Sequence, residues 1–262
     1  MTLVTAILSI LSGSLVGLSL GLIGGGGSIL AVPLMAYVVG LPPHTAIGTS
    51  AVAVAASALA NLGGHARART VKWPCALVFA VSGVAGAAIG AQIGKRVDGQ
   101  ALLAAFGVLM VAIAALMLRP RRAGHDPLVR LTGASAARLL PPLAGTGVAV
   151  GALSGFFGIG GGFLIVPGLI SATAMPLLNA IGSSLVSVSA FGATTAAFYA
   201  ASGLIAWRIA GLFILGGLAG GYAGIGAAKA LAGRKRTLAI LFSAVVALVG
   251  LYVAARGIAP FI

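Results

Sequence analysis

Two glycine-rich stretches hold the residues best suited to bind a ligand. Residues 24–33 read GGGGSILAVP, and residues 158–167 read GIGGGFLIVP. Each stretch ends one apolar run and begins another, so a helix starting there presents free N–H groups and the positive end of its dipole. Such a helix start binds an anion without burying a full positive charge. The chemistry that these residues predict is therefore anion binding.

The candidate binding residues come from these stretches and from the third apolar run of each half of the chain, at 45–63 and 180–201. In the first half they are Gly24, Gly25, Gly26, Gly27, Ser28, Thr49, Ser50 and Asn61, and in the second they are Gly158, Gly160, Gly161, Gly162, Ser183, Ser184 and Thr195. The alternative for each hydroxyl is a bond back to its own helix or to a neighbouring helix. His44 follows two prolines at the start of an apolar run, and its imidazole is either an anion contact, a proton carrier or an interface cap.

The chain has few residues that could carry out other kinds of chemistry. The two acids, Asp98 and Asp126, lie outside the apolar runs, so no carboxylate is available to hold a coupling cation in the membrane. Cys75 is the single cysteine, and neither glycine stretch continues into a Walker sequence. No carboxylate pair, metal-ligand cluster or nucleophile set can be assembled. We therefore expect no enzyme activity, no cofactor and no metal, and transport driven by the anion gradient and the membrane potential.

A single offset of 134 residues superposes the two parts of the chain. It places Gly17 on Gly151, Pro33 on Pro167, Ser50 on Ser184, Trp73 on Trp207 and Lys95 on Lys229. Close helix packing explains matched glycines, but it does not explain matched proline, tryptophan and lysine. We expect one repeat in residues 1–120, a basic cytoplasmic linker in 121–138 and a second repeat in 139–262.

The composition identifies the elements that must position these residues. Apolar residues make up 60% of the 262-residue chain and charged residues 7%, and the mean hydropathy is +1.17. These values are typical of an all-α polytopic membrane protein in contact with the lipid bilayer. The net charge of +14 lies in short loops, so it predicts membrane orientation and not nucleic-acid binding.

Ten apolar runs are expected, five in each repeat. They fall at 3–23, 27–40, 45–63, 73–94, 101–118, 140–157, 161–178, 180–201, 207–228 and 237–255. The second run of each repeat is short for a straight crossing, so we expect glycine-broken or short helices near the midplane. Five crossings per repeat place twelve Lys and Arg residues on one side and four on the other, whereas four crossings give ten and six. The charges thus favour two repeats of inverted topology, with both termini outside the cytoplasm.

The sequence resembles the TauE/SafE family of membrane transporters. The resemblance lies in GLIGGGGSILAVP at 21–33, GFFGIGGGFLIVP at 155–167, and the AIGTS and AIGSS elements at 46–50 and 180–184. It implies a multi-pass protein of the cytoplasmic (inner) membrane that exports a small sulfur-containing anion such as sulfite, sulfoacetate or a related sulfonate. Alternating access is the expected mechanism.

Two other functions fit the same composition. An anion channel shares the basic vestibules but needs a continuous pore, and a membrane scaffold subunit would use the linker for docking. The many small residues also leave room for a homodimer.

Overall fold

The first half of the protein forms five helical segments. The computed structural model describes residues 2–23, 25–118, 133–160, 162–230 and 235–259, and every element among them is helical. The elements of the first half are α1 (Leu3–Ile23), the 3-10 helix η1 (Gly25–Leu30), α2 (Ala31–Pro33), the π-helix η2 (Leu34–Val38), α3 (Pro43–Arg67), α4 (Trp73–Gly94) and α5 (Gly99–Leu118). η1, α2 and η2 follow one another directly and form the short second segment.

The second half repeats this order of long and short segments. Its elements are α6 (Gly133–Phe157), α7 (Gly162–Thr173), α8 (Leu177–Ala200), α9 (Trp207–Ala230) and α10 (Lys235–Ile258). Seven of the described helices are long and apolar enough to cross a membrane, and Ser28–Val38 and Gly162–Thr173 are shorter apolar helices. The expected all-α polytopic fold with a short second segment in each half is confirmed. Residues 121–132 of the expected linker lie outside the described residues, and residues 133–138 already belong to α6.

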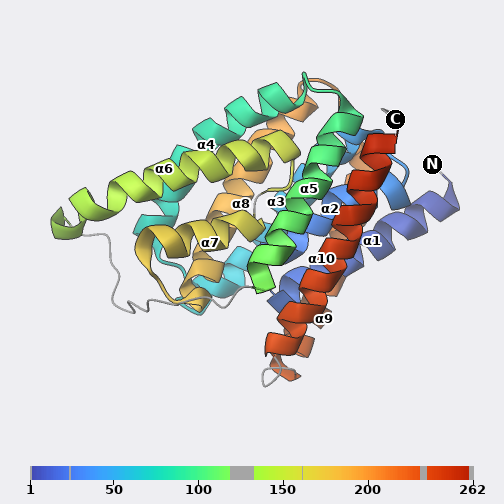
Figure 1. Ribbon diagram of the computed structural model, residues 1–262. Helices are drawn as coiled ribbons and strands as arrows, with labels where there is room; N and C mark the ends of the chain where they lie inside the picture. Colours follow the sequence, from blue (N-terminus) through green and yellow to red (C-terminus); the bar gives the residue numbers. More distant parts are fainter. Residues whose placement is uncertain (1, 24, 119–132, 161, 231–234, 260–262) are drawn as a thin grey trace.

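The two halves interlock, because the main helix contacts join one half to the other. α1 packs on α9 and α4 packs on α6, so the first helix of each half lies along the fourth helix of the other. α5 lies along α10, and α3 along α8 (Figure 1). Each half therefore covers the apolar faces of the other.

The contacts at glycines show how closely these helix pairs approach and in which direction they run. A Cβ on Gly17 would overlap the Gly217 carbonyl, and a Cβ on Gly151 would overlap the Gly83 carbonyl, so the matched pairs α1–α9 and α6–α4 approach at equivalent positions. Along both pairs residue numbers rise together, so the helices run parallel.

The pairs formed by equivalent helices run antiparallel. In α5 and α10, Gly107 meets Ala254 and Gly257 meets Ala104. In α3 and α8, Gly48 meets Tyr199 and Gly192 meets Ala55. Equivalent helices that pack side by side in opposite directions are the arrangement that an inverted repeat requires.

Backbone conformation follows the same 134-residue register. Gly40 and Ala174 both have positive φ, at 81° and 56°, and so do Arg69 and Gly203, at 54° and 69°. The left-handed region is strained for residues with a side chain and free for glycine. Each pair thus holds one glycine and one strained residue at the same turn.

We expect stability to change in opposite directions at two of these turns. Gly203→Ala should destabilise the protein by about 1 kcal/mol, because φ is positive and no atom lies within 4 Å of the new Cβ, which leaves backbone strain as the cause. Ala174→Gly should remove such strain and raise the melting temperature. Thermal unfolding of purified protein in detergent measures both, and a Gly203→Ala variant as stable as the parent would contradict the matched-turn interpretation.

Candidate functional site

A tight turn at residues 158–160 joins α6 to α7 and lies against the other half of the protein. Gly158 and Gly160 have φ values of +67° and +66°, which only glycine adopts without strain. A Cβ on Gly158 would overlap the side chain of Ile47, and one on Gly160 would lie 2.7 Å from Cγ1 of Val54. The absence of side chains thus brings the backbone of this glycine turn onto α3.

Ser50 lies on the face of α3 that the glycine turn covers. Ile47, Ser50 and Val54 are spaced as i, i+3 and i+7, so they share one face of the helix. Ser50 has no exposed surface, and its hydroxyl has no hydrogen-bond partner among the described residues. A buried hydroxyl usually finds a partner, so an unpaired one beside the glycine turn is available to a ligand.

Two further unpaired hydroxyls come from α8 and α6. Ser187 has no exposed surface and no hydrogen-bond partner, and the next residue, Val188, lies 3.4 Å from the Cβ position of Gly160. Ser154 is equally buried and unpaired, one turn before Gly158 on α6. Neither was predicted from the sequence, because their partners in the repeat are Ala53 and Leu20. The matched pairs Thr49–Ser183 and Ser50–Ser184 drew attention to hydroxyls present in both halves. Hydroxyls present in only one half, such as Ser154 and Ser187, were therefore missed.

Thr49 and Ser183 have a structural role. The Thr49 Oγ1 accepts a hydrogen bond of 3.0 Å from the N–H of Ala206, and the Ser183 Oγ accepts one of 2.9 Å from the N–H of Lys72. The two bonds are equivalent in the repeat, and each fixes the start of a fourth helix to the third helix of the other half. Thr49 and Ser183 were predicted from the sequence to bind a ligand, and in the structure their hydroxyls join the two halves.

Ser184 and Asn61 bond to their own helices. The Ser184 hydroxyl donates to the Ile181 carbonyl at 2.8 Å, and the Asn61 side-chain amide donates to the Ser57 carbonyl at 2.8 Å. Thr195, by contrast, is fully buried and has no partner. The predicted polar residues thus divide, and only Ser50 and Thr195 keep an unpaired hydroxyl.

The first glycine stretch approaches the second. η1 contains Gly25, Gly26, Gly27 and the fully buried Ser28, and it contacts both α7 and α8. Gly162 is the buried first residue of α7. Gly24 and Gly161 lie outside the described residues.

His44 stands apart from the glycine turn, at the start of α3. Its Nδ1 is buried without a partner, and its ring lies 6.5 Å from the ring of Tyr199, measured between centroids. Tyr199 is itself fully buried, with an unpaired hydroxyl. His44 precedes Ser50 by nearly two helical turns, so it lies on the way to the glycine turn and not in it.

The site is neutral. The buried polar side chains among the described residues are serines and threonines together with Tyr199, and no described group of three His, Cys, Asp or Glu side chains can hold a metal ion. Hydroxyl donors, peptide N–H groups and the start of α7 favour an anion there.

Comparisons with known proteins identify the family. Residues 9–253 match the family described as "Sulfite exporter TauE/SafE". A "Probable membrane transporter protein" of Xylella fastidiosa (strain Temecula1) is 49% identical over the full length of both chains. "Probable membrane transporter protein YunE" of Bacillus subtilis (strain 168) is 27% identical over 96% of this chain and 98% of its own.

No solved structure matches the chain. The family and these relatives are membrane transporters, so the expectations of a multi-pass membrane protein and of no enzyme activity are confirmed. The interlocked helices and the glycine turn described above are therefore the architecture of a transporter, and the chain belongs to the TauE/SafE family.

Proposed function

We propose that the protein exports a small anion containing oxidised sulfur, such as sulfite, sulfoacetate or a related sulfonate, across the cytoplasmic membrane. The observation that carries this proposal is the glycine turn at 158–160, packed on α3 beside the unpaired, fully buried hydroxyls of Ser50 and Ser187. Sulfur oxyanions present several acceptor oxygens, which such hydroxyl and N–H donors can satisfy together. The family description supports the substrate class.

Burial at the site favours a carrier over a channel. Ser50, Ser187 and Thr195 have no exposed surface, so the site is closed to both sides in this conformation. A ligand reaches it only after part of the structure opens, and alternating access would provide that opening. An open anion channel would keep a continuous water-filled path instead.

Lysine and arginine residues support an orientation. We call the end of the bundle that holds the α4–α5 connection the Lys95 end, and the opposite end the Lys72 end. Among the described residues, Lys95, Arg96, Arg208 and Arg256 lie at the Lys95 end, and the order of spans predicted from the sequence assigns the other twelve Lys and Arg residues to the opposite side. By the positive-inside rule the Lys72 end faces the cytoplasm and both termini lie outside, with the two halves inverted.

The membrane potential then favours transport of an anion out of the cell. An inside-negative potential of 100 mV drives each negative charge outward by about 2.3 kcal/mol. With Asp98 and Asp126 the only acids in the chain, and neither within a helical span predicted from the sequence, this drive acts without a coupled cation. A proton-coupled mechanism would have to run through His44 or through the titration of the substrate itself.

Counterflow in proteoliposomes tests the proposal. We expect saturable uptake of radiolabelled sulfite into vesicles loaded with unlabelled sulfite, with competition by sulfoacetate and weaker competition by chloride. Flux that does not saturate and shows no counterflow would indicate a channel. Activity that requires another subunit would indicate a scaffold, and no flux with any sulfur anion would reject the substrate class.

Ser50→Ala and Thr49→Val separate binding from structure at adjacent positions. Ser50→Ala should raise KM about tenfold or more, because a hydrogen bond to a charged ligand contributes about 1.5–3 kcal/mol, and should leave the melting temperature unchanged. Thr49→Val should lower the melting temperature, because it leaves the N–H of Ala206 unpaired.

Counterflow kinetics and thermal unfolding of the two variants give these values, with Ser184→Ala as the matched control on α8. Ser184 already bonds to its own helix, so we expect a smaller change in KM there than at Ser50. Wild-type KM in Ser50→Ala would show that the anion binds elsewhere.

A further inference from the structure

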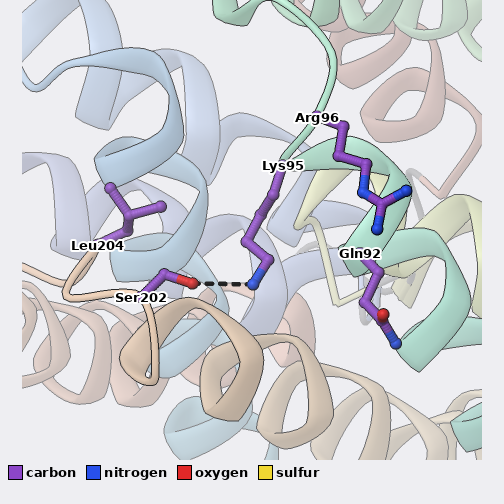
Figure 2. A pocket seen from close by; sticks show the side chains of 5 residues that line it. All are labelled: Gln92, Lys95, Arg96, Ser202 and Leu204. Carbon is purple, nitrogen blue, oxygen red and sulfur yellow. Dashed lines mark hydrogen bonds between the residues drawn. The ribbon is translucent and has the colours of Figure 1, made fainter.

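A pocket of about 410 Å³ opens at the Lys95 end, between the two halves of the protein. Gln92, Lys95 and Arg96 line it from the end of α4, and Ser202 and Leu204 line it from the segment after α8. Figure 2 shows the Lys95 side chain reaching across to Ser202, with Gln92 and Arg96 on the α4 side. The pocket therefore has cationic and hydrogen-bonding groups on walls from different halves.

Part of the Lys95 charge serves the fold. Its Nζ donates to the Ser202 Oγ at 2.8 Å and to the Phe198 carbonyl at 3.1 Å, near the end of α8, and lies 5.8 Å from the centre of the Phe198 ring. A cation at a helix C-terminus is stabilising in its own right. These bonds use two of the three donors of the ammonium group and join α4 to α8 across the halves.

The Arg96 and Gln92 side chains are free to bind a ligand. Within the described residues, no carboxylate lies in ion-pair range of Lys95 or Arg96, and neither Arg96 nor Gln92 makes a side-chain hydrogen bond. Asp98 is the nearest acid along the chain, and its Oδ1 accepts from the N–H groups of Gln100 and Ala101 at the start of α5. The pocket thus holds two positive charges that no described acid neutralises.

A series of unpaired polar atoms leads inward from this end of the protein. His44 Nδ1 and the Tyr199 hydroxyl lie at the start of α3 and the end of α8, and their rings are neighbours. Thr195 precedes Tyr199 by one turn on the same face of α8, and Ser50 lies deeper on α3. All four atoms are buried without a partner. Paired helices that carry such atoms from the pocket region to the glycine turn can provide a route for an anion once they separate.

We propose that the Lys95 pocket is a second oxyanion site, at the mouth of the pathway on the Lys95 side. This proposal rests on the transport function proposed above. Lys95 and Arg96 attract the anion, and the Gln92 side-chain amide donates hydrogen bonds to it. An anion bound there competes with Ser202 and the Phe198 carbonyl for the Lys95 ammonium group, so occupancy loosens the link between α4 and α8.

Transport kinetics of charge-neutralised variants test the role of the pocket. Arg96→Gln and Lys95→Gln should each raise the KM of sulfite counterflow about fivefold and weaken its dependence on ionic strength. Arg208→Gln is the matched control, because Arg208 lies at the same end of the bundle but lines a different pocket. An equal rise in KM for Arg208→Gln would mean that general surface charge is responsible, and would overturn the proposal.

A binding measurement separates this proposal from the transport function. Leu204 lines the pocket without a charge, and Leu204→Cys in a Cys75→Ala background can be alkylated with iodoacetamide in detergent, with sulfoacetate, phosphate or gluconate present at matched ionic strength. We expect sulfoacetate and phosphate to slow the reaction at least threefold relative to gluconate. Protection without counterflow of any sulfur anion would reject the transport proposal and retain the pocket as an oxyanion site.

A lipid phosphate headgroup offers the same oxyanion chemistry as a soluble anion, so a third experiment distinguishes the two ligands. The same variant is alkylated in nanodiscs of phosphatidylcholine and in nanodiscs containing phosphatidylglycerol. Protection by the soluble anions in phosphatidylcholine supports the proposal. Protection that requires phosphatidylglycerol, or none under any condition, overturns it.

Discussion

Every backbone N–H and C=O group in the hydrocarbon part of a bilayer needs a partner inside the protein, and this constraint governs the rest of the structure. A helix broken by glycine leaves such groups without helical partners, so it is tolerated only where other helices enclose it. Here the turn at 158–160 rests on α3 of the opposite half. The interlocking of the halves makes the break possible.

Because the halves interlock, residues that stabilise the fold lie next to residues that we propose bind the ligand. Thr49 and Ser183 use their hydroxyls to fix the beginnings of fourth helices in the other half, while the next residue of α3, Ser50, is left unpaired beside the glycine turn. Adjacent hydroxyls can differ in this way because successive helical residues point about 100° apart. One turn of α3 thus supplies a hydrogen bond that holds the two halves together and an unpaired hydroxyl that we propose binds the ligand.

Symmetry in this protein is a property of the backbone more than of the side chains. The matched turns at Gly40 and Ala174 keep the same positive φ although only one residue is glycine. The unpaired hydroxyls of Ser154 and Ser187 have no polar counterpart in the first half. The framework repeats because both halves must pack on each other, whereas groups proposed to surround a single ligand need no such repetition.

The sequence by itself determined the membrane class, the ten apolar segments, the short second segment of each half and the 134-residue register, because hydrophobicity, glycine and proline act locally. Tertiary structure decided which hydroxyls are free. Thr49 and Ser50 look equivalent in the sequence, and only the positions of Ala206 and the glycine turn distinguish them. A hydrogen-bond partner from another helix depends on how distant segments pack, and no local pattern encodes it.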